Sequence, residues 1–411
     1  MRTIYRVAIP DVGRPEAGSS QRFSDPAYLD YATPETLATA RTSRIMIFRR
    51  FYDDSLAQAS YMIACERSSE AIVVDPNMDI ETYLRAARDE GVRITAVTET
   101  HIHADFASGT RALAATTGAQ VHVSGEGGEG WQYSFAHEPG VNILHAGDEI
   151  TIGMVRLDVL HTPGHTPEHL TFLLTDRARS DVPVGALTGD FIFVGDVGRP
   201  DLLERAAGQV GTMRAAAASL YASIQAFKQL PDHLQIWPGH GAGSACGKAM
   251  SSASQSTLGY ERVANWALAP MAEPEFIEQV LEGQPPAPPY FGAMKARNRD
   301  ATVPRTLTLP RMMTGDEVAG LGATANALII DVRNDDEWRR GHIPGATLIP
   351  LPTLHTRLDE IPRDRAIILH CQRGSRSAVA AATLDAFGFD DVHELSGGMS
   401  AWEAAGHPVA T

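Results

Sequence analysis

Four apolar runs in this sequence are each followed by a short segment that carries histidine or aspartate. Apolar runs of this length are typical of buried strands, and loops at strand ends commonly hold ligands. Imidazole and carboxylate groups are ligands that proteins offer to zinc and iron. The pattern therefore predicts a strand-rich fold with a metal site at the strand ends. The segments are 100–106 after the run 94–98, 161–166 after the run 155–160, 188–191 after another apolar run, and 237–241 after the run 234–237.

Short apolar runs alternate with turn signals and helical segments along most of the chain, which predicts a mixed α and β class. Asp79 and Gly91 are expected to be the N-cap and the C-cap of a helix. The stretch 202–230 contains two internal glycines, so it predicts either two helices or one broken helix. Strands are expected at 61–65, 71–74, 94–98, 155–160, 170–174 and 234–237.

A dense proline run at 284–289 divides the chain, because such runs favour extended polyproline geometry over packed structure. Beyond it, predicted helices and strands alternate as in a small parallel, doubly wound domain. These are a helix at 316–321, strands at 327–332 and 366–370, and a helix at 375–387. We therefore expect an N-terminal extension (1–44), a first domain (45–265), a segment of helix and proline-rich linker (266–304) and a second domain (305–411).

The composition excludes some partners. With 35 basic and 50 acidic residues, the formal net charge is −15, which argues against a broad surface for nucleic-acid phosphates. No stretch approaches the roughly 18 apolar residues of a membrane span. Three cysteines (Cys65, Cys246 and Cys371) cannot form a disulfide framework and fit a reducing compartment. We expect a cytoplasmic protein that binds neither nucleic acid nor membrane. Acidic enzymes of this size are commonly symmetric oligomers, so we also expect a homo-oligomer.

The histidine-bearing segments resemble those of the metallo-β-lactamase superfamily, whose motifs occur here in the same order. These motifs are His-x-His-x-Asp-His, a Pro-Gly-His turn, a bridging aspartate and a final histidine. The resemblance covers about residues 45–265 and implies an αββα sandwich, which gives the fold class α+β and α/β for the two domains. Phe106, however, stands where the dinuclear hydrolases have a metal-binding histidine. A phenyl ring has no lone pair to donate, so a second-metal site would keep only Asp105 and His240, and a two-metal hydrolytic centre is disfavoured.

Within the superfamily, the chain is most similar to the persulfide dioxygenases, in which two histidines and one aspartate bind one ferrous ion. The resemblance implies that His101, His161 and Asp190 hold one Fe(II) per chain. Such a ligand set leaves open positions at which a sulfur substrate and O2 can bind side by side. His103, Asp105 and His240 are expected around these ligands, where they would hydrogen-bond a ligand or the substrate.

Three further residues are candidates for binding the substrate. Arg199 matches a position at which the dioxygenases place an arginine near the thiol carrier. It is expected either to bind a carboxylate or phosphate of the substrate or to form a structural ion pair with Asp201. Cys246 is either a buried apolar residue or part of the substrate channel. Lys248 is a candidate contact for an anionic carrier.

The second domain carries one cysteine between a predicted strand and a predicted helix. The strand 366–370 leads directly into Cys371-Gln372-Arg373-Gly374-Ser375-Arg376. Backbone N–H groups at a helix start and two arginines all favour a thiolate over a thiol. The pattern therefore predicts that Cys371 is reactive.

This segment resembles the active-site loop of the rhodanese sulfurtransferases, and the resemblance extends over roughly 305–411. Supporting motifs occur in the family's order at 328–333, 341–346 and 395–402. The resemblance implies that Cys371 attacks a sulfur donor and stores the sulfur as a persulfide. Loop N–H groups, from Gln372, Gly374 and Ser375, would hold that persulfide, and Arg373 and Arg376 would orient the anionic donor. Asp331 and Arg333 are expected to form an internal ion pair.

Together the resemblances predict a fusion of a persulfide dioxygenase and a rhodanese, as in sulfide detoxification. The first domain would convert a low-molecular-weight thiol persulfide, for example of glutathione or coenzyme A, with O2 to sulfite and thiol. The second would move sulfane sulfur between thiosulfate or sulfite and a thiol or persulfide. Two alternatives stay open: a zinc-dependent thioester hydrolase of the glyoxalase II type, and a second domain that is a sulfur-carrier or sensing module.

Overall fold

The computed structural model describes residues 46–53, 56–202, 211–244, 246–284, 288, 291–300, 311–322 and 327–411. The expected N-terminal extension (1–44), most of the proline run and the expected start of the second domain lie outside these residues. Among the described helices, none combines the length and the apolar content that a membrane crossing needs.

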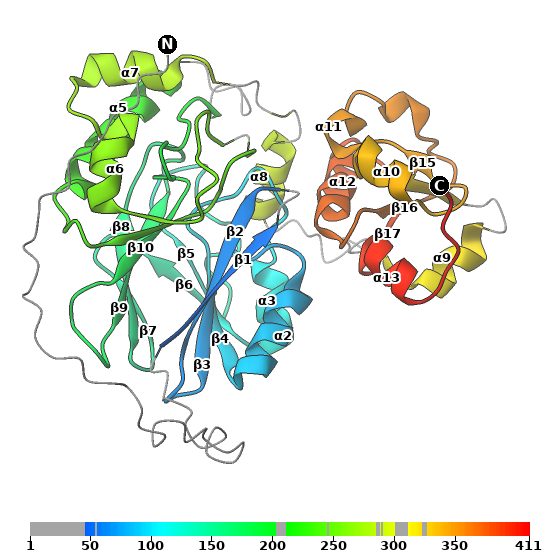
Figure 1. Ribbon diagram of the computed structural model, residues 1–411, viewed down its shortest axis with the longest axis horizontal. Helices are drawn as coiled ribbons and strands as arrows, with labels where there is room; N and C mark the ends of the chain where they lie inside the picture. The colour runs from blue at the N-terminus through cyan, green and yellow to red at the C-terminus, as the bar shows by residue number, and fades with distance from the viewer. Residues whose placement is uncertain are drawn as a thin grey trace, which may run out of the picture. The chain divides into compact units, whose positions relative to one another are not determined.

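The first domain contains two six-stranded sheets (Figure 1). In the first sheet, β1 and β2 pair antiparallel, β2 and β3 pair antiparallel, and β3 to β6 pair in parallel. Its order is the order of the chain, so each strand lies beside its sequence neighbour. The strands are β1 (Met46–Asp53), β2 (Gln58–Cys65), β3 (Glu70–Val74), β4 (Arg93–Thr98), β5 (Gln120–Ser124) and β6 (Val141–Leu144).

The second sheet has the order β12-β11-β10-β9-β8-β7. All of its neighbours pair antiparallel except β10 and β11, which are parallel. As a result β8, β10 and β11 run in the same direction, and their carboxyl ends lie on one edge of the sheet. The strands are β7 (Glu149–Ile152), β8 (Val155–His161), β9 (Leu170–Asp176), β10 (Gly185–Gly189), β11 (Gln235–Pro238) and β12 (Ser256–Thr257).

The two sheets pack face to face, and helices cover their outer faces. Side chains such as Tyr61 on β2 and Phe172 on β9 are buried together between the sheets. The outer face of the first sheet packs on α2 (Ile80–Glu90) and α3 (Thr110–Thr117). That of the second packs on α5 (Met213–Phe227) and α7 (Glu273–Leu281). The predicted αββα sandwich is thus confirmed, and it is driven by burial of about 1.5–3 kcal/mol for each large apolar side chain.

The local helix signals also agree with the structure. α2 begins after Asp79 and ends at Gly91, whose φ of 69° is the left-handed conformation that glycine adopts at little cost. In the stretch 202–230 the structure describes α5 and a helical residue at Leu202, and because residues 203–210 lie outside the description, the choice between two helices and one broken helix stays a prediction.

The segment 266–300 follows α6 (Leu258–Ala264), and its described residues form a short 3-10 helix (Trp266–Leu268) and the two α-helices α7 and α8 (Phe291–Asp300). α7 packs on α5 through Phe276 and Val280. α8 presents Asn298, whose amide donates to the carbonyls of His103 and Phe106 at 2.9 and 2.8 Å. This segment therefore supports the loop that carries the first histidines.

The second domain is a five-stranded sheet in which every neighbouring pair is parallel, with the order β13-β17-β16-β14-β15. α11 and α12 pack on one face, and α9 and α13 pack on the other. The predicted doubly wound arrangement is confirmed. Its elements are β13 (Arg311–Met313), α9 (Gly315–Gly322), β14 (Ala327–Asp331), α10 (Asp335–Arg340), β15 (Thr347–Leu348), α11 (Leu351–Leu354), η3 (Leu358–Glu360), β16 (Ala366–His370), α12 (Ser375–Ala386), β17 (Val392–Leu395) and α13 (Gly398–Ala404).

Candidate metal centre and sulfur-transfer loop

Three buried side chains from separate segments meet where β4, β8 and β10 end. His101 follows β4, His165 follows β8 and Asp190 follows β10. Nε2 of His101 and Nε2 of His165 lie 4.0 and 3.5 Å from Oδ2 of Asp190. This Oδ2 is buried and has no hydrogen-bond partner among the described residues. Two imidazole nitrogens around an unsatisfied carboxylate oxygen are a donor set that a metal ion would complete.

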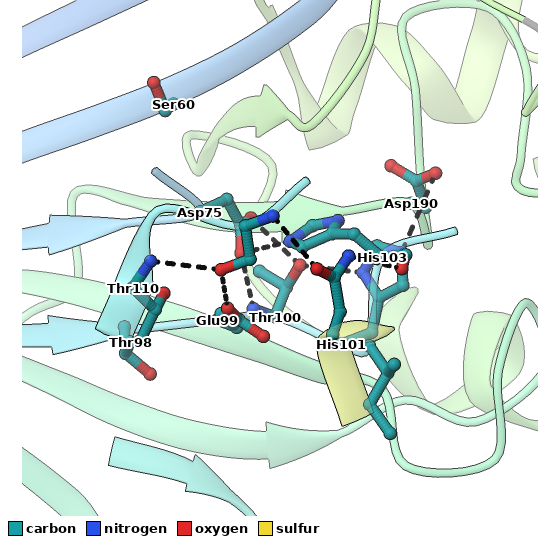
Figure 2. Close-up of polar contacts among 12 residues, drawn as sticks. Ser60, Asp75, Thr98, Glu99, Thr100, His101, His103, Thr110 and Asp190 are labelled. Carbon is teal, nitrogen blue, oxygen red and sulfur yellow. Dashed lines mark hydrogen bonds and ion pairs between the residues drawn. The ribbon is translucent and has the colours of Figure 1, made fainter. Parts of the chain in front are cut away.

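The backbone and neighbouring side chains orient these imidazoles. Nδ1 of His101 lies 3.0 Å from the hydroxyl of Thr100 (Figure 2). Nδ1 of His165 lies 3.1 Å from the carbonyl of Arg199, which can only accept, so Nδ1 carries the proton and Nε2 keeps a lone pair. Burial lowers the pKa of both rings, that of His101 to well below its usual range. Both imidazoles are therefore neutral, as metal ligands must be.

The prediction that His161 is a ligand needs correction, because the structure brings His165 to the site instead. His161 ends β8, its side chain is 28% exposed, and its Nε2 lies 2.7 Å from the carbonyl of Pro167. After His161 the chain turns at Gly164, whose φ is 149° and at which a Cβ atom would lie 2.4 Å from Cβ of Leu220 on α5. The turn carries His165 back toward Asp190. The Pro163-Gly164-His165 sequence was the available signal, since a glycine that allows close approach precedes the ligand.

The residues expected around the ligands lie there. Nε2 of His103 is 3.0 Å from Oδ1 of Asp75, and its ring centroid is 4.3 Å from that of His101. Burial opposes a charge on His103, but the Asp75 carboxylate raises its pKa to about 9. His240 lies between two carboxylates: Nδ1 is 2.7 Å from Oδ1 of Asp190, and Nε2 is 2.7 Å from Oδ2 of Asp105.

Asp75, which was not predicted as a site residue, organises the first histidine loop. Its carboxylate accepts from the backbone N–H and the hydroxyl of Thr100, at 2.6 and 2.9 Å, as well as from His103 (Figure 2). Its φ of 53° is unusual for a residue other than glycine, and such strain is often found at functional sites. The signal was the Asp75-Pro76 pair at the end of β3.

Another residue that was not predicted, His169, contacts both the ring of His101 and the backbone of Asp190. Its Nε2 accepts the backbone N–H of Asp190 at 3.1 Å, and its ring stacks on that of His101 with centroids 5.0 Å apart. Nδ1 of the same ring then donates to the hydroxyl of Thr162 at 2.9 Å. The contacts hold both a ligand ring and the backbone of the aspartate.

Phe106 and Cys246 border the same centre. The Phe106 ring is buried, with its centroid 4.4 Å from that of the His103 ring. Cys246 is 2% exposed, and its Sγ lies within 4.8 Å of ligand atoms of Asp105 and His240. Burial raises the pKa of this thiol well above its usual range, and the Asp190 and Asp105 carboxylates act in the same direction. Cys246 is therefore a neutral thiol that is both buried and close to the metal centre.

The structure places the other two candidate substrate residues in structural contacts. The guanidinium of Arg199 is buried and pairs with both oxygens of Asp201, at 2.7 and 2.8 Å, which is the second of the two expected alternatives. Nζ of Lys248 donates to the carbonyl of Glu282 at 2.8 Å, just beyond α7, where a cation also stabilises the helix dipole. The Arg199 carbonyl, rather than its side chain, serves the centre by orienting His165.

In the second domain, Cys371 directly follows β16, and α12 begins four residues later at Ser375. Its side chain is 1% exposed, and its Sγ accepts the backbone N–H of Gly374 at 3.1 Å. Gly398 lies under this loop: a Cβ there would be 2.4 Å from the Cys371 carbonyl oxygen, and its φ is 58°. Backbone N–H groups that face a sulfur atom favour the thiolate.

The polar residues of this loop are tied to their surroundings. Arg376 forms a two-bond ion pair with Glu337, at 2.6 and 2.8 Å, whereas Arg373 is exposed. The amide of Gln372 accepts from Arg333 at 3.0 Å and donates to Ser400 at 3.1 Å. The side chain of Ser375 lies outside the described part of the chain.

The expected internal ion pair of the second domain is present. Arg333 donates to Asp331 at 2.7 Å, and both side chains are almost completely buried. Because the same Arg333 also bonds Gln372, the pair connects the end of β14 to the cysteine loop.

Comparisons with known proteins agree with both halves of this geometry. The family model of the metallo-beta-lactamase superfamily matches residues 54–240, and the model of the rhodanese-like domain matches residues 314–405. The crystal structure of a metallo-beta-lactamase from Staphylococcus aureus subsp. aureus COL is 39% identical, with a TM-score of 0.64. The match covers 86% of this chain and 99% of the chain in that crystal structure. This chain belongs to the metallo-β-lactamase superfamily and has a C-terminal rhodanese domain.

Two curated relatives that match this chain are named for different reactions, a hydrolysis and an oxygenation. A hydroxyacylglutathione hydrolase from Polaromonas sp. is 33% identical over 44% of this chain, and the match spans only 61% of the relative's length. The mitochondrial persulfide dioxygenase ETHE1 of Bos taurus is 27% identical over 47% of this chain and 68% of its own. Membership of the superfamily therefore leaves the reaction to be argued from the site.

Proposed function

We propose that this protein oxidises a low-molecular-weight thiol persulfide with O2 and water to thiol and sulfite at the His101–His165–Asp190 centre. We further propose that Cys371 transfers sulfane sulfur between thiosulfate or sulfite and a thiol or persulfide. The observation that carries the first part is the meeting of two imidazoles and one carboxylate beside Phe106. The resemblance to persulfide dioxygenases supports the same reading.

The donor set fits one ferrous ion. Oδ2 of Asp190 lacks a partner among the described residues, and Nε2 of His165 keeps its lone pair because Nδ1 donates to the Arg199 carbonyl. When bound by two histidines and one carboxylate, ferrous iron supplies adjacent open positions for a sulfur ligand and O2. The histidine that a second-metal site would need beside Asp105 and His240 is replaced by the buried, apolar ring of Phe106.

The chain's own residues would prepare the reaction in three ways. His101 and His165 are held neutral by burial and in fixed orientation by Thr100 and the Arg199 carbonyl. Burial of the whole cluster excludes bulk water from the reacting sulfur. His240 donates to Asp190 and Asp105, so the carboxylates keep a fixed position.

Sulfur transfer at the second site follows from the Cys371 loop. The thiolate would attack the outer sulfur of thiosulfate, a new S–S bond would form, and sulfite would leave with the electron pair of the old S–S bond. Transfer of that sulfur to an acceptor thiol regenerates Cys371. The Gly374 N–H already faces Sγ, and the exposed Arg373, which forms no ion pair with the residues that the structure describes, can meet an anionic donor. Because the first reaction forms sulfite and the second handles sulfite and persulfide, the two chemistries share their small molecules.

A thioester hydrolase is the second candidate, and the hydrolase relative at 33% identity favours it. The zinc hydrolases it would resemble use two metal ions, and Phe106 removes one of the side chains that a second ion would need. The two candidates therefore differ in metal content as well as in their need for oxygen.

The test is anaerobic purification with metal quantification, followed by oxygen uptake on persulfides of glutathione, coenzyme A and cysteine. We expect about one iron per chain and oxygen uptake that matches sulfite formation with one of these carriers. Zinc in place of iron, together with oxygen-independent cleavage of thioesters, would show that the protein is a hydrolase.

A further inference from the structure

Glu394, in the second domain, is a buried carboxyl group for which the proposed sulfur transfer has no use. It lies on β17 with 5% of its surface exposed. Its Oε2 is 2.8 Å from the hydroxyl oxygen of Ser377, on α12. Burying a carboxyl group is unfavourable, and more so if it is charged, so its place beside the cysteine loop calls for an explanation.

Ser377 connects this carboxyl group to the reactive sulfur. Its side chain is fully buried, and its hydroxyl oxygen is 3.9 Å from Sγ of Cys371, within hydrogen-bonding range for sulfur. The same oxygen lies 2.8 Å from the carbonyl of Gly374. A continuous polar path of two steps thus runs from the thiol through the hydroxyl to the carboxyl group.

The single proton of the Ser377 hydroxyl limits which hydrogen bonds this path can form. The Ser377 hydroxyl has one proton, but both the Gly374 carbonyl and an ionised Glu394 would accept it. If Glu394 is protonated, its own O–H donates to Ser377, and the hydroxyl proton is released to the Gly374 carbonyl. The Gly374 carbonyl oxygen and Oε2 of Glu394 then each take part in a hydrogen bond with Ser377. These contacts therefore favour the protonated form of Glu394 over the charged form.

The charges around Glu394 allow it to exchange that proton near neutral pH. Burial raises the pKa of Glu394 to about 7, although the bond from Ser377 and the guanidinium of Arg297 on α8 act in the opposite direction. The other titratable group on the path is the Cys371 thiol itself.

We propose that Ser377 and Glu394 form a proton relay that takes up and returns the proton of the Cys371 thiol, which rests on the proposed role of Cys371 as the sulfur carrier. The S–H bond breaks and its electron pair stays on sulfur as the thiolate. The thiol proton passes to Oγ of Ser377 while the Ser377 hydroxyl proton passes to Oε2 of Glu394. The reverse movement returns the proton when Cys371 is released from its persulfide. Glu394 touches no reacting atom, so it is a positioning residue that acts through Ser377.

The first measurement does not depend on sulfurtransferase activity. The rate of alkylation of Cys371 by iodoacetamide is followed against pH, with the modified peptide identified by mass spectrometry. If the relay operates, the alkylation rate depends on the proton of the carboxyl group as well as on that of the thiol, so we expect two steps in the profile, one of them near pH 7. Glu394→Gln keeps the size of the side chain but cannot exchange a proton, and we expect it to leave a single step. Two unchanged steps in Glu394→Gln would overturn the relay.

The second measurement is single-turnover loading of Cys371 with sulfur from thiosulfate. We expect Glu394→Gln and Ser377→Ala each to slow loading by about 100-fold, at the low end of general acid–base effects, and the double variant to be no slower than either. Ser377→Thr and Glu394→Asp keep the hydroxyl and the titrating carboxyl group, so both should retain most of the rate. Additive losses in the double variant would mean that the two residues act separately and would overturn the relay.

Matched controls separate the relay from other causes. Asp390→Asn removes an exposed carboxylate from the same domain and should change neither measurement. If Glu394→Gln does not fold, Ser377→Ala against Ser377→Thr decides: an undiminished rate in Ser377→Ala contradicts the proposal, and a loss restored by threonine supports it. If the natural protein accepts no sulfur at all, the proposed function fails, while the alkylation profile still tests the coupling.

Discussion

The two candidate sites of this chain both form at the ends of strands, but they are assembled in different ways. The metal centre takes His101, His165 and Asp190 from three loops that are far apart in the sequence. The cysteine loop uses six consecutive residues, 371–376, and a backbone N–H three residues from the sulfur. The first site therefore depends on how the sheets pack, whereas most of the second depends on a local strand-to-helix turn.

The difference also appears in what supports each site. The metal centre is held by side chains from other loops, such as Asp75 and His169. The cysteine loop is held mainly through its backbone, against Gly398, and by the Arg376–Glu337 pair. Substitutions at the two sites should accordingly affect separate activities.

The largest expected effect is that of Cys371→Ser. Removing the proposed nucleophile should lower thiosulfate-to-thiol sulfur transfer by at least about 1,000-fold, because the proposed carrier of the sulfur is lost. Oxygen uptake on persulfides should not change, since the metal centre is separate. Sulfur transfer is measured as the formation of a persulfide on a thiol acceptor. If full transfer persists, Cys371 belongs to a carrier or sensing module rather than to a transferase.

The second prediction compares two histidines that lie four residues apart. His165→Ala removes a proposed ligand and should lower bound iron to about a tenth of its normal content, with a matching loss of oxygen uptake. His161→Ala removes a partly exposed ring that bonds a carbonyl, and it should retain both. Iron analysis of the two purified variants measures the contrast. The opposite result would restore His161 as the ligand.

The third prediction concerns the packing under the cysteine loop. Gly398→Ala introduces a methyl group 2.4 Å from the Cys371 carbonyl oxygen at a positive φ, which should lower stability by about 3 kcal/mol in total. Gly406→Ala is the matched control: its φ is 77°, but a Cβ there meets nothing within 4 Å. It should lose only about 1–2 kcal/mol of conformational energy. Urea unfolding of both variants gives the difference, and equal losses would show that the close contact relaxes.

The smallest expected effect is a dependence of stability on pH at His370. Burial lowers the pKa of this histidine to about 4, and both ring nitrogens lack hydrogen-bond partners within the described chain. The unfolded chain, with a pKa of about 6.5, binds more protons than the folded chain between pH 6.5 and pH 4. The free energy of unfolding should therefore decrease as the pH is lowered through this window. At pH 5 it should be roughly 1–2 kcal/mol lower than at pH 7.

The test for this prediction is a comparison of His370→Gln with the natural protein by urea unfolding at pH 7 and pH 5. Glutamine does not titrate, so the loss of stability on acidification should be smaller in the variant by that amount. An equal loss in both proteins would mean that other groups cause the acid sensitivity.

Much of the fold was predictable because its signals are local. The apolar runs that form β2, β3, β4, β8 and β9, and the caps of α2 at Asp79 and Gly91, all follow from short stretches of sequence. Short strands such as β7 and β12 were not predicted, because their few residues are defined by pairing with neighbours rather than by their own pattern. The same limit explains Asp75, whose importance depends on Thr100 and His103 lying opposite it.

The sequence alone determined the class of the two domains, the residue types of both candidate sites and the place of Cys371 between a strand and a helix, since each depends on neighbours in the chain. Only the tertiary structure decided which histidine at or after the end of β8 lies near Asp190. The chain turns at Gly164, so that His165 lies beside Asp190 and His161 does not. The tertiary structure also placed Arg199 in an ion pair with Asp201 and Glu394 within hydrogen-bond distance of Ser377. Contacts between distant segments come from packing, and no pattern within a single segment contains them.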